Sequence, residues 1–89
     1  MQKVRVLERW MRAAGNHRRI EMLVILDENP ELSVSEIAEK LKINMKTASE
    51  HIRRLTIAGF IMKRSQGKNI RHKLTTRGYN ILTFLRTLE

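Results

Sequence analysis

The stretch SVSEIAEKLKINMKTASEHIRRLTIAG, from Ser33 to Gly59, decides the fold because it predicts two helices joined by a short turn. Ser33 can cap the first helix, and Glu36 stands three residues later, as in a capping box. Apolar residues then recur at helical spacing as far as Leu41. Asn44 suits the start of a second helix, and Gly59 suits the position after its end. The stretch therefore predicts a pair of helices that pack through one apolar seam.

The second helix, residues 44–58, carries polar groups opposite its apolar side. At about 100° per residue, Ala48, Ile52 and Leu55 share one sector that can pack on the first helix. The other side carries cations, hydroxyls and one acid: Lys46, Thr47, Ser49, Glu50, Arg53 and Arg54. Such groups suit the phosphates and base edges of a DNA major groove, although a lone helix of this kind is more often a solvated surface.

The positive charge of the chain is concentrated in one segment. The 89 residues include 18 Lys and Arg against 9 Asp and Glu, a formal net charge of +9. Residues 40–77 hold eleven of these cations and a single acid, Glu50. Such a block predicts a surface that binds a polyanion, which could be DNA, RNA or an acidic membrane. A membrane-surface helix would need a broad apolar face, and here the apolar face serves the core.

The composition restricts the class of protein. A chain of this length makes one domain, residues 1–89. Without cysteine it has no disulfide, thiolate metal site or thiol nucleophile. No apolar run approaches the roughly 20 residues of a membrane span, and charged residues interrupt the N-terminus where a signal peptide would be apolar. We expect a cytoplasmic protein without catalytic activity, cofactor or bound metal, and we expect no metal at the lone histidines His17 and His72.

The remaining segments complete a mainly helical fold with a small β-hairpin, of the α+β class. Apolar spacing predicts helices at both ends and a central core helix, and alternation after Gly59 predicts two strands around a glycine turn. A very short strand is possible at Glu31-Leu32, and Thr75 or Thr76 can cap the last helix. The predicted segments are helix 2–14, helix 17–28, strand 60–64, turn 65–69, strand 70–74 and helix 76–88.

The terminal segments 1–14 and 76–88 have apolar stripes that one small domain cannot cover. We expect them to meet a second copy of the chain, so that the protein is a homodimer. The predicted interface residues are Val4, Leu7, Trp10, Met11, Ile81, Phe84, Leu85 and Leu88.

A helix pair followed directly by a basic hairpin is the arrangement of a winged helix-turn-helix, and the sequence resembles regulators of the ArsR type. The resemblance is strongest from Leu32 to Ile61, where Ile37-Ala38-Glu39-Lys40-Leu41 follows the family's I-A-x-x-L helix. The stretch from Thr47 to Ile61 is similar to the family's second helix and its A-G-L-V ending. Leu74 to Gly78 also resembles the L-T-x-x-G step of MarR-type regulators. The resemblance implies a homodimeric, DNA-binding transcription regulator.

The resemblance does not extend to metal sensing. Metal-sensing members of the ArsR family carry an E-L-C-V-C-D/E-L box, and this chain has hydroxyls at both cysteine positions of the segment Glu31 to Ile37. Hydroxyls are poor ligands for soft metals. The other known sensor site uses His and carboxylates of the last helix, and residues 76–88 contain none.

Two residues of the second helix keep alternative roles. Glu50 could accept from a cytosine amino group or pair with Arg54 one turn later. His51 could contact phosphate, as the resemblance implies, or be a partly buried histidine bonded to backbone.

Arg18 and Arg19 could reach the DNA backbone from helix 17–28. The hairpin, residues 61–74, would contact the backbone or minor groove through Lys63, Arg64, Lys68, Arg71 and Lys73.

Three functions remain open at this point. The first is sequence-specific binding of double-stranded DNA by a dimer, with helix 44–58 in the major groove. The second is nonspecific or architectural DNA binding, for which the charge alone would suffice. The third is a winged-helix module that binds a protein, which would more often expose an apolar patch. Ile57 is the one hint of such a patch, since it falls on the exposed side of the second helix.

Overall fold

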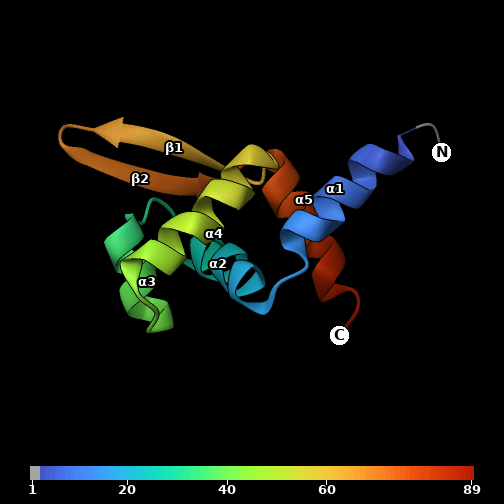
Figure 1. The fold of residues 1–89 in the computed structure, drawn as a ribbon, viewed down its shortest axis with the longest axis horizontal. Helices are drawn as coiled ribbons and strands as arrows, with labels where there is room; N and C mark the ends of the chain where they lie inside the picture. Colours follow the sequence, from blue (N-terminus) through green and yellow to red (C-terminus); the bar gives the residue numbers. More distant parts are fainter. Residues whose placement is uncertain (1–2) are drawn as a thin grey trace.

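The structure, a computed structural model, describes residues 3–89 and has the expected order of elements (Figure 1). The fold class predicted from the sequence is confirmed: helices surround a two-stranded antiparallel hairpin. The elements are α1 (Val4–Ala14), α2 (His17–Glu28), α3 (Val34–Leu41), α4 (Met45–Ile57), β1 (Ile61–Gln66), β2 (Asn69–Leu74) and α5 (Thr76–Arg86).

Side-chain caps fix where the helices begin. The Asn16 side chain accepts from two backbone N–H groups of the first turn of α2. Ser33 and Glu36 form the full capping box of α3, with bonds of 3.3 and 3.0 Å. Asn44 accepts from the backbone of α4 at 2.7 Å, and Thr75 caps α5. These caps occupy donors that have no partner inside the helix, so local sequence alone sets the starts.

The terminal helices are shorter than predicted. The first described helix begins at Val4, whereas the predicted start at residue 2 lies outside the described residues. The last helix ends at Arg86, because the backbone N–H of Thr87 is shared among carbonyls of the final turn and the helical ladder stops there. Leu88 therefore follows the helix and is exposed. Among residues 3–89, no helix has the length and apolar character needed to cross a bilayer.

The hairpin is longer and its turn tighter than the sequence predicted. Strand pairing continues to Gln66 and Asn69, leaving a turn of two residues where five were expected. Gly67 explains the difference because it takes a φ of +61°. Glycine at the first central position is typical of a type II′ turn, whose twist matches the strands on both sides. The hairpin forms the wing that projects from the left of the molecule in Figure 1.

The base of the wing is joined to the segment before α3. Leu32 forms a single antiparallel bridge with His72 of β2, as the expected very short strand. The backbone N–H of Glu31 donates to the His72 carbonyl at 2.8 Å, and that of His72 donates to the Leu32 carbonyl at 2.9 Å. This bridge fixes the wing relative to the helix pair.

α2 is the central helix of the core, as the sequence predicted. It lies in the middle of the molecule (Figure 1) and packs against α1, α3, α4, α5 and β2. Its own fully buried side chains are Met22, Leu23 and Leu26. The fully buried apolar side chains of the other elements come from α3, α4, the start of β1 with the residue before it, and α5: Ile37, Ile52, Leu55, Phe60, Ile61 and Leu82.

Candidate nucleic-acid interface

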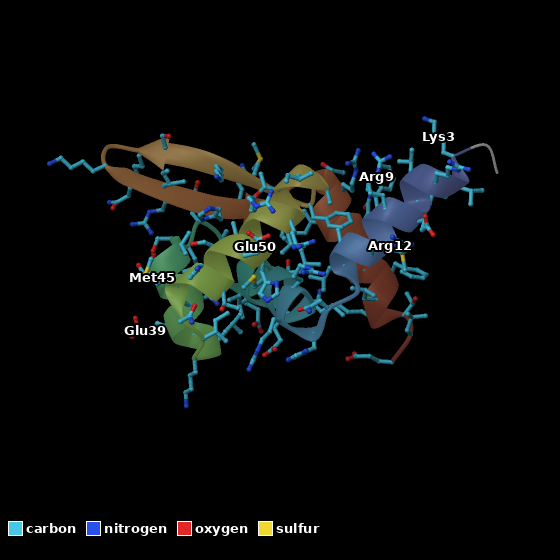
Figure 2. The ribbon with its side chains drawn as sticks, viewed as in Figure 1. Lys3, Arg9, Arg12, Glu39, Met45 and Glu50 are labelled. Atoms are coloured by element: carbon cyan, nitrogen blue, oxygen red, sulfur yellow. The ribbon has the colours of Figure 1, made fainter. Side chains whose placement is uncertain are left out.

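The exposed face of α4 presents the residues that the sequence placed there. Ala48, Ile52 and Leu55 are buried against the core. The residues on the other side are exposed, namely Lys46, Thr47, Ser49, Glu50, Arg53 and Arg54. Figure 2 shows Met45 and Glu50 along this helix, beside the wing, and Arg9 and Arg12 on α1 in the other half of the molecule. α4 packs against β1 of the wing, and the two elements carry the exposed cations of this segment. We call α4 and the wing the basic surface.

Glu50 binds both arginines of this face. Its carboxylate accepts two hydrogen bonds from Arg53, at 2.8 and 3.2 Å, and lies 3.3 Å from Arg54. The predicted pair with Arg54 is present, and Arg53 is a second partner that the sequence analysis did not name. The hydrogen bonds from Arg53 lower the pKa of Glu50, so the carboxylate stays charged at neutral pH. The two guanidinium groups are therefore held together on one side of the helix.

His51 lies half-buried at the edge of this face. Its Nδ1 atom is 3.2 Å from the Arg19 guanidinium of α2. The histidine is thus bonded to a side chain, whereas one of the two expected roles had it bonded to backbone. Arg19 also donates to the carbonyls of Ala13 and Arg12 in α1. Arg18 forms a surface pair with Glu21.

The two wing arginines are bonded to the segment that leads into α3. Arg64 lies 2.7 Å from the Glu31 carboxylate. Arg71 donates to the Glu36 carboxylate at 3.0 Å and to the Glu31 carbonyl at 3.1 Å. Glu36 is also the capping acid of α3, so Arg71 links the cap to the wing. These bonds orient the wing, and Arg64 and Arg71 remain predicted DNA contacts.

The lysines carry the unpaired charge of this surface. Within residues 3–89, each ion pair closer than 4 Å uses an arginine as its cation. The ammonium groups without such a partner include those of Lys46, Lys63, Lys68 and Lys73. Of these, Lys68 stands in the turn at the tip of the wing. The lysines offer an unshared charge to phosphates, whereas these arginines share theirs with a carboxylate.

A second, apolar surface lies between α1 and α5, away from the wing. An open groove of about 720 Å³ is lined mainly by apolar residues of the two helices, among them Leu7, Trp10 and Phe84. Arg77 of α5 lies over the Trp10 ring, with its guanidinium carbon 4.0 Å from the ring centre. Of the predicted interface residues, Val4, Met11, Phe84 and Leu88 are exposed, whereas Leu7, Trp10, Ile81 and Leu85 are half-buried.

Residues 3–89 contain no cluster of three His, Asp or Glu side chains placed to hold a metal ion. His72, which the sequence left without a role, is buried at the base of the wing and bonded to the Leu32 carbonyl at 3.0 Å.

Comparison with known proteins gives matches to regulators. The sequence pattern of the MarR family matches residues 16–73. The chain is similar to the winged helix-turn-helix DNA-binding domain of a possible ArsR-family regulator from Mycobacterium bovis, with a TM-score of 0.86 and 22% identity over 96% of this chain and 79% of that one. It is similar to HlyU from Vibrio cholerae, with a TM-score of 0.84 and 25% identity over 98% and 92% of the two chains. It is also similar to the repressor BigR from Xylella fastidiosa, with a TM-score of 0.82 and 22% identity over 98% of this chain and 86% of that one. No curated protein sequence matches significantly.

The expected likeness to winged-helix regulators is confirmed, and the match spans α2, α3, α4 and nearly all of the wing. The likeness to the ArsR type is one of fold, shared with the domain from M. bovis. The family pattern is that of MarR, and the L-T-x-x-G step at Leu74 to Gly78 lies just beyond the matched residues. Several similar solved structures are described as transcription regulators, and BigR is described as a repressor. The chain belongs to the MarR family of DNA-binding winged helix-turn-helix transcription regulators.

Proposed function

We propose that the chain binds a specific double-stranded DNA sequence as a homodimer, with α4 in the major groove and the wing on the backbone or in the minor groove. The observation that carries this proposal is the exposed face of α4. It presents cations, hydroxyls and one acid next to a wing with unpaired lysines. A helix of this kind fits the major groove, and a basic hairpin beside it fits the flanking phosphates.

The proposed roles follow from position on the helix. Lys46, Arg53 and Arg54 would contact phosphates or bases, and Thr47 and Ser49 would bond to either. Glu50 supports sequence-specific over nonspecific binding, because a carboxylate on this face is repelled by phosphate yet can accept from a cytosine amino group. Lys63, Lys68 and Lys73 would contact the backbone, joined by the remaining N–H donors of Arg64 and Arg71.

The homodimer is proposed from the apolar surface of the terminal helices. Met11 and Phe84 line one groove and are exposed, and Val4 and Leu88 expose further apolar groups on the terminal segments, which a second copy could cover. The related domain from M. bovis is described as homodimeric. Two α4 helices in successive major grooves would read an inverted repeat whose half-sites lie about one helical turn apart. In this proposal the chain needs no catalytic activity, cofactor or metal. It acts in the cytoplasm, where the DNA is.

The first experiment is selection from a random duplex library, followed by titration of selected and scrambled duplexes across salt. We expect an inverted repeat that binds at least about 10³-fold more tightly than scrambled DNA. Equal binding of all duplexes, with a salt slope near −0.9 per phosphate contact, would support an architectural protein instead. No binding at low salt would support a module that binds a protein.

Replacing Arg53 and Arg54 with alanine tests whether α4 is the reading helix. We expect affinity for the selected duplex to fall about a hundredfold or more, because one good bidentate base contact contributes roughly 5- to 150-fold. The control is Arg5→Ala with Arg9→Ala, which removes the same charge from the exposed side of α1. Equal losses in the two double variants would show that only net charge matters. Wild-type affinity in the α4 variant would remove this helix from the interface.

A further inference from the structure

Arg19 joins three helices through one side chain. It belongs to α2, and its Nε donates to the Ala13 carbonyl at 2.6 Å while one Nη donates to the Arg12 carbonyl at 3.4 Å. Both carbonyls lie in the last turn of α1, where they have no partner inside the helix. The other Nη lies 3.2 Å from Nδ1 of His51 on α4. The guanidinium fork is therefore held in place by backbone before it meets the histidine.

This contact determines which nitrogen of His51 carries the hydrogen. A guanidinium can only donate hydrogen bonds, so Nδ1 of His51 must accept with its lone pair. The neutral ring then has its hydrogen on Nε2. Within residues 3–89, Nε2 has no hydrogen-bond partner, and it is not among the buried atoms that lack one, so it reaches the surface. His51 therefore presents an N–H donor at the edge of the α4 face.

Burial and the surrounding charges keep this ring neutral. Burial lowers the pKa of His51 most, and the charge of Arg19 lowers it next. Arg54 of α4 and His17 of α2 act in the same direction, whereas Glu50 opposes them. The Arg12 side chain turns away to Glu8 on the surface of α1. A ring with a lowered pKa is neutral at pH 7 and above, where it keeps the hydrogen on Nε2.

We propose that Arg19 is a positioning residue of the DNA interface, which holds His51 so that its Nε2–H donates to a phosphate oxygen of the bound duplex. This inference rests on the proposed function of α4. Phosphate is the expected acceptor because His51 lies at the side of the exposed face, about 100° around the helix from Glu50, where a helix in the groove meets the backbone. Arginine suits this task because its fork can bond the α1 carbonyls and the ring together.

The first test is spectroscopic and uses the free protein. In nitrogen-15 spectra of the histidine rings at about pH 7.5, we expect His51 to be protonated on Nε2 and bare on Nδ1. In Arg19→Gln we expect this preference to weaken and the pKa of His51 to rise, because a positive charge is removed. Arg18→Gln is the matched control and should change neither. A wild-type ring that is charged, or protonated on Nδ1, would overturn the proposal without any variant.

The second test measures affinity for the selected duplex. His51→Gln keeps an N–H donor at similar reach and should bind within about threefold of the wild type, whereas His51→Leu should bind roughly tenfold more weakly or worse. Arg19→Gln should weaken binding in the wild-type background and add little in His51→Leu. Equal effects in both backgrounds would mean that Arg19 acts only through α1, against the proposal. If the wild type binds no duplex, the proposed function and the phosphate contact both fail, whereas the ring spectra still report on the Arg19–His51 contact.

Discussion

His72 and His51 carry their ring hydrogen on opposite nitrogens, in each case because of the partner at Nδ1. Nδ1 of His72 faces the Leu32 carbonyl at 3.0 Å, and a carbonyl can only accept, so this nitrogen holds the hydrogen. Nε2 of His72 is left as a buried lone pair without a partner among residues 3–89. A second proton on the ring would bind to this Nε2, where its N–H would have no hydrogen-bond acceptor. The pKa of His72 is accordingly lowered, mainly by burial and also by the charge of Lys63, against the opposing effect of the Leu32 bond.

This lowered pKa predicts a loss of stability on mild acidification. The unfolded chain takes up a proton at His72 near pH 6.5, and the folded chain resists it. The unfolded state then binds more protons, so the free energy of unfolding falls as the pH drops below about 6.5, until the pH is below the folded pKa. His72→Asn removes the titration but can keep a donor toward Leu32. We expect this variant to be less stable near pH 7.5 by about 1–3 kcal/mol, with a flatter pH dependence.

Urea unfolding at about pH 7.5 and pH 5.5 measures this difference and avoids most carboxylate titration. The pKa of His51 is also lowered, so His51 can contribute to the pH dependence of stability. The variant His51→Gln measures that contribution. If His72→Asn retains the full pH dependence of the wild type, the titrating group lies elsewhere.

At the scale of elements, the junction between the wing and α5 depends on a close approach at Gly78. A Cβ built on Gly78 would overlap the carbonyl oxygen of Phe60, a backbone atom that cannot swing away. The same carbonyl accepts from the backbone N–H of Thr75 at 3.0 Å, and Thr75 caps α5 through the N–H of Gly78. The L-T-x-x-G step thus packs the last helix directly onto the start of β1.

Gly78→Ala tests this junction, because two effects act in opposite directions. Alanine favours a helix over glycine by roughly 0.5–1 kcal/mol, whereas forced overpacking costs about 1–3 kcal/mol. We expect the overlap to dominate, with a net loss of stability in urea unfolding. Thr83→Ala, at an exposed position of the same helix, should stay within about 0.5 kcal/mol of the wild type. A more stable Gly78→Ala would mean that α5 can move off the Phe60 backbone at little cost.

The sequence predicted the helix starts and the exposed face of α4 because both follow from nearby residues. Ser33 with Glu36, Asn44 and Thr75 cap helices within three positions of themselves. Left-handed backbone at Lys42, with a φ of 56°, was not predicted, because this conformation is uncommon outside glycine and depends on how α3 and α4 pack.

The side-chain bonds that join different elements of the site could not be predicted either, because they also depend on how the elements pack. Arg71 meets Glu36 across 35 positions of sequence, and Arg19 meets His51 across 32. No local period or motif encodes such a distance. The bonds of Glu50 could be predicted only in part. Its pair with Arg54 follows from helical spacing, whereas its shorter bond to Arg53 depends on the side-chain conformations in the structure.

At the scale of the whole molecule, the two candidate interfaces are built on different elements. The Cα atoms extend 42 × 26 × 22 Å, with the wing at one end of the long axis and the N-terminal part of α1 at the other (Figure 1). The basic surface covers α4 and the wing, and the apolar groove lies between α1 and α5. Substitutions at one interface should therefore leave the other largely intact, since well-separated sites behave independently.

This separation gives the last prediction, in which dimerisation and DNA binding are disrupted one at a time. Phe84 is 45% exposed beside the groove, and Phe84→Glu would bury a charge in an apolar interface, so we expect a folded monomer in sedimentation equilibrium. Its affinity for the full inverted repeat should fall to that for a single half-site. Ile57→Glu makes the same kind of change at a residue 71% exposed on α4, and should remain a dimer while binding DNA more weakly. If Phe84→Glu stays dimeric, the α1–α5 groove is not the dimer interface. If it is monomeric and still binds the full repeat as the wild type does, each copy reads its half-site independently.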